Sequence, residues 1–511
     1  MVAVGLPGLG SILVALPSDV CLGYTLGPLV SHVYALAGYW GGDLCTGPAL
    51  GFSCGTAVVI YWHRDSHRCC CWRVVRGPSI CDDVGQRSRS NSPAGELTLK
   101  PQFAAGESCN PRMKVLMVDP SNFTLPYDTA LCGALGRLVD ELVLVCRPLR
   151  DGEDASAVGY QVLPAFYRAS ERLAKRVSHQ SPLKILKGLE HFISMVNLAT
   201  IVRSRQPHIV HFQWPAIPIV DQVFIRLIRR NIPVVLTIHD SKPFHGNASF
   251  VLQTKGWHQL ARLCDHIIVL TKFTKTNVEM WGIHPSKISV VPIGILWPQP
   301  YGQAPLRPLH SDGISGRIVI VLWGSIKHYK GVDVLLRAIA LMPPHHRNRI
   351  IVRVAGKAYI ALRPLEELAK RLGVSEYLRW EARFIPQQEL HQLLSLADIL
   401  VFPYRDIDAS AAVMASIPFA KPIVASRIGG LAEILENGKH GYLVPPEDPL
   451  ALAAALTELV ADPDLRRRMG EEVRRLAESI PSWHEIAAAT LQVYNRVISE
   501  RRHLGEPRLS R

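Results

Sequence analysis

The chain has 511 residues, a net charge of +14 at pH 7, 48% hydrophobic residues and 20% charged residues. These are ordinary globular values, which exclude wholesale disorder and leave room for two or three domains. A basic surface favours an anionic partner such as an acidic lipid or a phosphorylated substrate. Since no nucleic-acid-binding motif accompanies the charge, we expect no nucleic-acid partner.

Residues 1–112 differ in composition from the rest of the chain, and most of the 11 cysteines lie in this segment. The apolar stretch 11–40 is interrupted by Pro17, Asp19 and Pro28, so it makes a poor membrane-spanning helix. We expect a poorly ordered extension or a misassigned start, with translation beginning at Met113; a membrane-associated extension is the alternative. The few cysteines after Met113 suit a reducing cytosol without structural disulfides.

The segment 113–297 alternates apolar runs with amphipathic patterns. Its continuous Val/Ile/Leu runs predict strands that are buried on both faces, as in a parallel sheet covered by helices. These runs are 114–119, 141–147, 209–214, 233–239, 266–271 and 288–294. The patterns at 127–139 and 218–230 predict helices between the strands. We therefore predict a first doubly wound domain over 113–297.

A second series of strands and helices follows a Pro/Gly-rich linker at 298–313. Its predicted strands are 317–324, 349–356, 378–384, 397–404, 422–426 and 441–445. The second domain is predicted over 298–480, and residues 481–511 are predicted to hold a helix, about 483–502, that crosses back to the first domain. Two such domains place ligands at the carboxyl ends of their strands, in the cleft between them.

The stretch "LWGSIKHYKG" indicates one anion site. Gly324 follows a strand, where a glycine lets backbone N–H groups approach an anion, and Lys330 and Lys327 supply positive charge. A solvated basic loop is the alternative interpretation.

The stretch "DIDASAAVMASIPFAKPIVASRIGG" (406–430) indicates a second anion site. Ser410 is placed to cap a short helix that Pro418 ends, and Ala411 and Ala412 leave the first amides of that helix open. A tightly packed small-residue helix is the alternative. Two anion sites that face one cleft fit a diphosphate group.

Four motifs carry a family resemblance, in the order "GSIKHYKGVDVLLRA", "FIPQQELHQLLSLADILVFPYRD", "AKPIVASRIGGLAEILENGKHGYLVPPEDP" and "SWHEIAAATLQVY". The chain resembles glycosyltransferase family 4, the group 1 glycosyl transferases with the α/β GT-B fold of two Rossmann-like domains. The resemblance implies a retaining, metal-independent hexosyltransferase without a cofactor. It would use a nucleotide-diphospho-sugar donor and a glycan or lipid-linked acceptor, in cell-surface polysaccharide biosynthesis in the cytoplasm.

The resemblance also implies roles for individual residues. Gly324, Ser325, Lys327 and Lys330 would bind the donor diphosphate together with Ser410, Ala411 and Ala412, although the family has an arginine where Ser325 stands. Arg383, Phe384 and Ile385 match the loop that frames the nucleotide base. His239 matches a histidine beside the transferred sugar, and Asp240 follows it as a second catalytic candidate.

Two family glutamates, which contact the sugar and the ribose, are absent. Their positions fall at Ile407 and Ala415, and only Asp406 and Asp408 are near enough to replace the first glutamate. The loop "PSNFTLPYD" also lacks the paired glycines that are common there. These departures keep a non-catalytic homologue that binds a sugar nucleotide or glycan as the alternative. An epimerase on the same fold is less favoured, and a dinucleotide oxidoreductase is unlike this chain because no G-x-G-x-x-G follows a strand.

The stretch 167–192 carries Arg168, Arg172, Lys175, Arg176, Lys184 and Lys187 among Leu, Ile and Val residues. This pattern suits docking on anionic lipid, and a solvated helix face is the alternative. We therefore expect a peripheral location on the inner face of the cell membrane.

Overall fold

The computed structural model describes residues 2–6, 9–14, 113–153, 155, 158–174, 180–242, 253–296 and 316–505. The chain divides into two compact units, Met1–Phe103 and Ala104–Arg511. In the first unit, β1 (Val2–Leu6) and β2 (Leu9–Val14) pair as an antiparallel hairpin. The other predictions for residues 1–112 and the predicted linker 298–313 lie outside the described residues.

The N-lobe, residues 113–296, is built on a parallel sheet with the strand order β5-β4-β3-β6-β7-β8-β9. Its strands are β3 (Lys114–Asp119), β4 (Glu141–Cys146), β5 (Gln161–Pro164), β6 (Ile209–Phe212), β7 (Val234–Ile238), β8 (His266–Val269) and β9 (Ile288–Val290). Its helices are α1 (Leu125–Leu135), α2 (Arg168–Ala174), α3 (Gln180–Arg205), α4 (Pro218–Ile228), α5 (Trp257–Leu263) and α6 (Lys272–Glu279). β6, β7 and β8 are buried throughout, which confirms the predicted parallel sheet.

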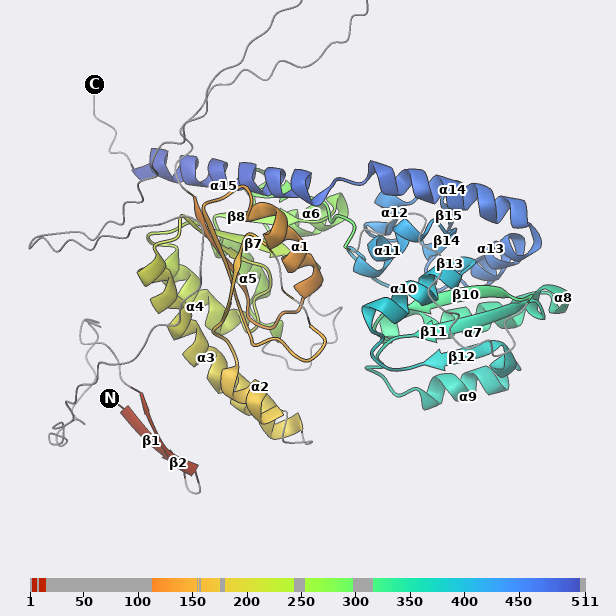
Figure 1. Cartoon of the computed structure of the whole chain (residues 1–511), viewed down its shortest axis with the longest axis horizontal. Helices are drawn as coiled ribbons and strands as arrows, with labels where there is room; N and C mark the ends of the chain where they lie inside the picture. The colour runs from red at the N-terminus through yellow and green to blue at the C-terminus, as the bar shows by residue number, and fades with distance from the viewer. Residues whose placement is uncertain are drawn as a thin grey trace, which may run out of the picture. The chain divides into compact units, whose positions relative to one another are not determined.

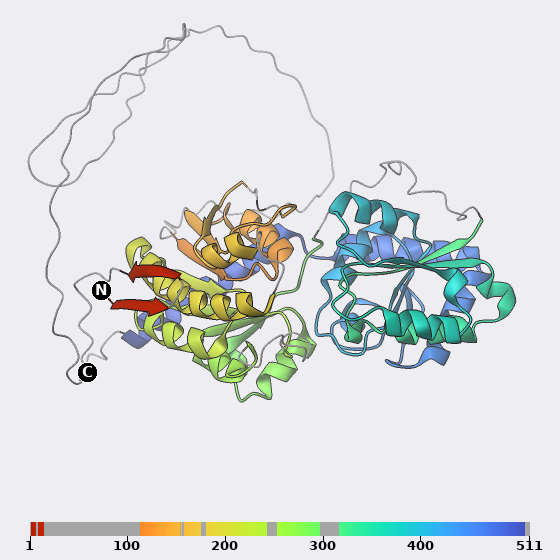
Figure 2. The ribbon, with the colours of Figure 1, turned by 90° about the horizontal axis from the view of Figure 1, so that it is seen from below.

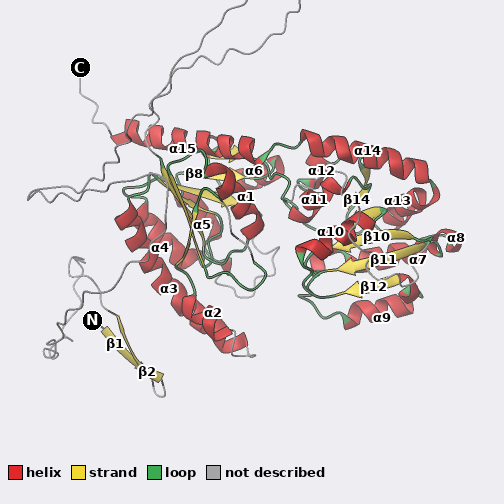
Figure 3. Ribbon diagram, in the orientation of Figure 1, coloured by secondary structure: helices red, strands yellow, loops and turns green. Residues whose placement is uncertain are grey.

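The C-lobe, residues 316–482, has a second parallel sheet with the order β12-β11-β10-β13-β14-β15 (Figure 1). Its strands are β10 (Ile318–Trp323), β11 (Ile350–Ala355), β12 (Leu378–Glu381), β13 (Ile399–Phe402), β14 (Ile423–Ser426) and β15 (Gly441–Val444). Its helices are α7 (Val332–Leu341), α8 (Pro344–Arg347), α9 (Arg363–Arg371), α10 (Gln387–Leu396), α11 (Ala411–Ser416), α12 (Leu431–Ile434), α13 (Pro449–Ala461) and α14 (Pro463–Ser479). Figures 2 and 3 show helices covering the strands.

Each sheet reverses its strand order beside its first strand. β3 lies between β4 and β6, and β10 lies between β11 and β13. The loops that leave the carboxyl ends of the two neighbouring strands therefore diverge and open a crevice, which is where doubly wound sheets bind ligands. The loops after β3 and β10 are thus placed to form the two walls of a site.

Local sequence explains where several helices begin. Asp448 accepts hydrogen bonds from the Leu450 and Ala451 amides at the start of α13, and Asp462 caps α14 in the same way; each cap precedes a proline. The helix predicted at 127–139 is α1, which starts two residues earlier and ends at Leu135. α11 ends at Ser416, and a 3₁₀ turn, Ile417–Phe419, contains the proline that was predicted to end it.

The last helix, α15 (Trp483–Gly505), packs against the N-lobe (Figure 1). Its Tyr494 hydroxyl lies 2.6 Å from Nδ1 of the buried His211, and the Trp483 Nε1 donates to the Ile295 carbonyl oxygen at 2.7 Å. The Trp483 ring also meets the edge of Tyr127 on α1, with 5.3 Å between ring centroids. This helix therefore joins the end of the C-lobe to the N-lobe core.

Hydrogen bonds also connect the lobes near the crevice. The Glu433 carboxylate of α12 accepts from the amides of Lys272 and Phe273 at 2.9 and 2.6 Å, so it caps α6 of the other lobe.

The described cysteines, Cys132, Cys146 and Cys264, are free and buried, in agreement with the prediction for this part of the chain. Within the described residues no helix has both the length and the apolar character that a membrane crossing needs.

Candidate functional site

A cavity of about 1020 Å³ lies between the lobes, at the carboxyl ends of β3 and β10. We call it the cleft. The N-lobe lines it with residues of the loop after β3, with Trp214, His239 and Asp240, and with the ion pair of Arg147 and Glu153. The C-lobe lines it with residues of the loop after β10, among them Gly324, Ser325, Lys327 and Lys330, and with Ile407 and Ala409 to Ala412. The predicted diphosphate residues and the two catalytic candidates therefore share one cavity.

Lys330 is the centre of the C-lobe wall. Its side chain is 4% exposed, its Nζ donates to the Tyr404 hydroxyl, and the same nitrogen lies 4.1 Å from the centroid of the Tyr404 ring. Gly324 has φ +110°, and a Cβ at this position would lie 3.2 Å from Lys330 Nζ and 3.9 Å from the Ala412 Cβ. The glycine thus allows the turn after β10 to pass close to the lysine and to the start of α11.

The cations of this wall are electrostatically unusual. Burial lowers the pKa of Lys330 to about 7, repulsion by Lys327 adds to the effect, and Asp240 opposes it. Burial also lowers the pKa of Lys327. Across the cleft, burial and repulsion by Asp408 raise the pKa of Asp240 well above its ordinary value, while Lys327 opposes the rise. A cleft with desolvated ammonium groups favours an anionic ligand, because the anion restores the charge balance.

The start of α11 forms the second part of the wall. Ser410 is the N-cap, and its hydroxyl accepts from the Val413 amide at 3.2 Å, which confirms the predicted cap. Ala411 and Ala412 line the cleft at the first positions of the helix, where amides have no partner within the helix. Ser325 is exposed and lies in the same wall. The arrangement is suited to a second phosphate group, and the phosphate-binding role of these residues stays a prediction.

His239 stands on the opposite wall. It is 7% exposed, its Nε2 lies 3.2 Å from the Gln213 Oε1, and its ring meets the edge of Tyr127 with 4.9 Å between centroids. Burial lowers its pKa to about 3, so the ring is neutral at physiological pH. An amide oxygen only accepts, so Nε2 donates to Gln213 and Nδ1 keeps its lone pair. His239 is therefore an uncharged hydrogen-bonding group.

The two positions without a glutamate are apolar in the structure as well. Ile407 lines the cleft and is 5% exposed, whereas Ala415 is fully buried inside the small-residue helix. The Asp408 carboxylate accepts from the amide and hydroxyl of Ser241 at 2.7 and 3.0 Å, and Asp406 pairs with Lys242 at 2.8 Å. Both carboxylates thus bridge the lobes, and neither lines the cleft.

The predicted base loop also lies away from the lining. Arg383 forms a bidentate pair with Glu389, and the Phe384 side chain is 67% exposed. Ile385 packs against the apolar core. None of the three lines the cleft.

Sequence reasoning missed two features of the cleft. Tyr404 holds Lys330 from a position 74 residues away, and Trp214 and Phe123 stack with 4.5 Å between their centroids. The signal for the last pair was available, since "PSNFTLPYD" places an aromatic residue where the family has glycines.

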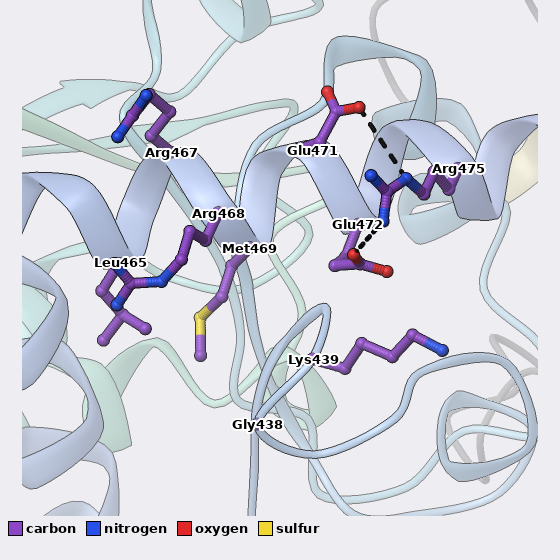
Figure 4. Close-up of a pocket in the computed structure, with 9 residues that line it drawn as sticks. All are labelled: Gly438, Lys439, Leu465, Arg467, Arg468, Met469, Glu471, Glu472 and Arg475. Carbon is purple, nitrogen blue, oxygen red and sulfur yellow. Dashed lines mark hydrogen bonds and ion pairs between the residues drawn. The ribbon is translucent and has the colours of Figure 1, made fainter.

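A second hollow, of about 780 Å³, lies along α14 and beside Gly438 (Figure 4). Glu471 and Glu472 both pair with Arg475 one helical turn away, and Lys439 pairs with Glu436. These are exposed i,i+3 and i,i+4 pairs, which are typical of a solvated helix face. We assign no function to this hollow.

Solved structures share the architecture of the chain. Anabaena Alr3699/HepE in complex with UDP and glucose is 16% identical with a TM-score of 0.57, covering 75% of this chain and 100% of that one. Sucrose-phosphate synthase from Thermosynechococcus elongatus is 16% identical with a TM-score of 0.57, over 76% of this chain and 100% of its own. The chain thus has the GT-B fold.

Family profiles match both lobes. "Glycosyltransferase Family 4" matches residues 129–295, and "Glycosyl transferases group 1" matches residues 311–476. The chain therefore belongs to the group 1, family 4 glycosyltransferases. D-inositol 3-phosphate glycosyltransferase of Streptomyces coelicolor is 30% identical over 269 residues, covering 48% of this chain and 58% of the relative. The D-inositol 3-phosphate glycosyltransferase of Thermobispora bispora is 31% identical, and the match covers 50% of this chain and 61% of the relative. The chain spans less than two thirds of these relatives.

Proposed function

We propose that the chain transfers a hexosyl group from a nucleotide-diphospho-sugar to a glycan or lipid-linked acceptor, with retention and without a metal ion. The observation that carries this proposal is the desolvated Lys330 beside Gly324 and the start of α11, facing His239 and Asp240 across the cleft. Negative charge grows on the diphosphate as it leaves. Lys330, Lys327 and the first amides of α11 are placed to stabilise that charge. No cofactor other than the donor substrate is required.

The neutral His239 has a different task in this scheme. Since Nε2 is committed to Gln213, its Nδ1 is available to accept a hydrogen bond from a sugar hydroxyl. Such a bond orients the sugar without adding charge. Asp240 supplies the nearby carboxyl, whose raised pKa makes it a hydrogen-bond donor as well as an acceptor. Positioning of this kind accounts for a large share of rate enhancement in group transfer.

A non-catalytic homologue is the second candidate, because Ile407 and Ala415 replace both glutamates. Two measurements on the full chain separate the candidates. Calorimetric titration with UDP-, GDP- and ADP-sugars tests binding, and nucleoside diphosphate release in the presence of mixed glycosides tests turnover. We expect binding and release with one nucleotide. Binding without release would favour the non-catalytic homologue, and no binding of any nucleotide would contradict both.

We also propose that the acceptor lies at the cytoplasmic surface of an anionic membrane, in cell-surface polysaccharide biosynthesis. Support comes from the α3–α4 face, a set of exposed apolar side chains on two neighbouring helices. Its members are Leu189, Phe192, Ile193, Val196, Ile219, Val223 and Leu227. Arg168 and Arg172 are exposed on α2, which packs against α3, whereas Lys187 pairs with Glu171 at 3.0 Å. An apolar face with nearby cations fits an anionic bilayer.

Vesicle co-sedimentation tests this location. At low salt the full chain should bind phosphatidylglycerol vesicles and not phosphatidylcholine vesicles, and Ile193→Glu should weaken the binding because the carboxylate is repelled. Met280→Glu, at an exposed apolar residue on another helix end, is the matched control. A wild-type chain that ignores both vesicles would contradict the proposal.

A further inference from the structure

The segment that leads into α11 also holds the N-lobe. Asp408 lies between Ile407 and Ala409, which both line the cleft, whereas Asp408 itself is 4% exposed and does not line it. Its carboxylate accepts hydrogen bonds from the Ser241 amide at 2.7 Å and from the Ser241 hydroxyl at 3.0 Å. Its carbonyl oxygen accepts from the Gly430 amide of its own lobe at 2.8 Å. Asp408 is therefore anchored in the C-lobe and bonded through its side chain to the N-lobe.

Ser241 belongs to the segment that carries the two catalytic candidates. β7 is followed directly by His239 and Asp240, which line the cleft, and then by Ser241. The Ser241 hydroxyl donates to Asp408 and accepts from the Asn277 Nδ2 of α6 at 3.0 Å. A hydroxyl has one hydrogen to donate, so these two bonds give it a single orientation. The chain of hydrogen bonds from Asn277 through Ser241 to Asp408 thus fixes the backbone just after His239.

The electrostatics of Asp408 indicate that Ser241 is its main partner. Burial raises the pKa of Asp408, and the hydrogen bonds from the Ser241 hydroxyl and amide are the largest effects that oppose the rise. A buried carboxylate that accepts two hydrogen bonds from one residue holds that residue more firmly than an exposed ion pair does. The neighbouring pair of Asp406 and Lys242 joins the same segments at 2.8 Å, but the Lys242 side chain is 68% exposed. We therefore expect the contact between Asp408 and Ser241 to fix the two segments.

This contact is close in sequence to both halves of the donor in the proposed reaction. Ser410, which caps the helix that is proposed to hold the diphosphate, comes two residues after Asp408. His239, which is proposed to orient the sugar, comes two residues before Ser241. The bond that breaks joins the sugar to a diphosphate oxygen, so it lies between groups held by different lobes. A misplacement of about 1 Å between such groups lowers a rate about a hundredfold.

We propose, on the basis of the transferase function above, that Asp408 is a positioning residue. By holding Ser241, it fixes His239 of the N-lobe relative to the start of α11 of the C-lobe, and so aligns the sugar with the departing diphosphate. Asp408 touches neither group. It therefore affects turnover and not the affinity for the nucleotide, which the C-lobe wall binds alone.

Steady-state kinetics on the full chain tests this role, with UDP-, GDP- and ADP-glucose as donors and mixed glycosides as acceptors. Asp408→Ala should lower kcat for nucleoside diphosphate release by about tenfold or more, while the donor KM and the affinity for the free nucleoside diphosphate change less than about twofold. Asp408→Asn keeps one acceptor oxygen, so its kcat should lie between those of Asp408→Ala and the wild type. Lys242→Gln breaks the exposed ion pair between the same segments and is the matched control, with an unchanged kcat.

Ser241→Ala tests the other partner of the contact. This variant removes the hydroxyl and keeps the amide, so kcat should fall less than in Asp408→Ala. Adding Ser241→Ala to Asp408→Ala should lower kcat no further, because both changes remove the same contact. If Asp408→Ala does not fold, a wild-type kcat in Ser241→Ala overturns the role of the contact.

Hydrogen exchange detects the contact without turnover. In Asp408→Ala the amides of residues 239–242 should exchange about tenfold faster or more, and those of β10 should be unchanged. Unchanged exchange at 239–242, or a wild-type kcat in Asp408→Ala, would overturn the positioning role alone. A nucleotide affinity that falls as much as kcat, or an equal loss of kcat in Lys242→Gln, would also overturn it. A wild-type chain that releases no nucleoside diphosphate would contradict the proposed function, and the positioning role with it.

Discussion

The two walls of the cleft differ in whether their cationic side chains form salt bridges. On the C-lobe wall, Lys330 is buried against tyrosine rings, and no carboxylate within the described residues forms a salt bridge with it. On the N-lobe wall, Arg147 and Arg150 are held by Glu153 and Glu171. A buried ammonium group without a salt-bridge partner favours the binding of an anionic ligand. An arginine that is held in a salt bridge stabilises the local structure instead. The difference favours binding of an anionic ligand at the C-lobe wall.

The walls also differ in how they are built. The C-lobe wall uses small residues, Gly324 and the alanines of α11, which expose backbone amides. The N-lobe wall uses large rings: Phe123 on the loop after β3, which hydrogen bonds to the buried Asp119 fix, and Trp214 after β6. Small residues suit a phosphate, and rings suit the face of a sugar.

The largest effect is expected from Ala415→Glu. Ala415 is fully buried, so the new carboxylate would be an unpaired buried charge that costs roughly 3–5 kcal/mol. We expect a clear loss of stability in urea unfolding. Ala411→Glu is the matched control on the same helix, since Ala411 is exposed at the cleft and should tolerate the carboxylate. Increased nucleotide affinity in a stable Ala415→Glu variant would instead show that the ribose contact of the family is latent here.

Lys330→Ala should separate binding from stability. The loss of one charge-assisted contact, about 1.5–3 kcal/mol, weakens UDP binding and turnover about ten- to a hundredfold. Thermal stability should be unchanged or higher, because a desolvated ammonium group is removed. Lys357→Ala changes the net charge equally outside the cleft lining and should bind UDP normally. Equal losses of UDP affinity in both variants would show that the net charge of the protein, and not the contact made by Lys330, causes the effect.

The pH dependence of UDP binding tests the role of Lys330 in a second way. Lys330 has a pKa of about 7 in the free protein, and a bound diphosphate should raise it. Binding therefore takes up a proton above pH 7, and UDP affinity should fall between pH 7 and 9 by up to about tenfold per pH unit. Titration in buffers of different ionisation enthalpy measures the proton uptake. Lys330→Ala should lose most of this dependence, and a wild-type affinity that rises with pH would contradict it.

The smallest effect is expected at the base of the N-lobe wall. Burial and repulsion by Asp119 raise the pKa of Asp128 well above its ordinary value. A raised carboxyl pKa stabilises the folded protein at low pH and loses this contribution as pH rises through the folded-state value. Asp128→Asn removes the titration, so it should match the wild type near pH 3, below the unfolded-state pKa, and melt about 2–4 °C higher at pH 9. A variant less stable at pH 9 would show that Asp128 is needed as a carboxylate.

Strand prediction succeeded because the buried runs are continuous. The runs chosen in both lobes correspond to observed strands, and central strands such as β3 and β10 are buried throughout or nearly so. The hairpin of β1 and β2 was not predicted, and in the lobes the missed strand is β5, whose four residues are only partly buried at the sheet edge. β5 has only four residues and no long continuous apolar run, so periodicity does not reveal it.

The site was predictable where its residues are close in sequence. Ser410 caps its own helix, and Gly324 precedes Lys330 by one loop, so local chemistry was sufficient. Asp408 was expected near the sugar, but its partner is Ser241, which is 167 residues away in the other lobe. The burial of Lys330 against Tyr404 depends on packing between distant segments in the same way. Such contacts depend on tertiary structure, and no local pattern encodes them.

The most direct test of the central claim is a crystal structure of the chain with UDP and glucose. We predict the diphosphate on the C-lobe wall, with phosphate oxygens within hydrogen-bonding distance of Lys330 Nζ and of the Ala411 and Ala412 amides, and no phosphate at Arg147. A diphosphate bound at the arginines of the N-lobe wall, or outside the cleft, would contradict the division of labour between the two walls.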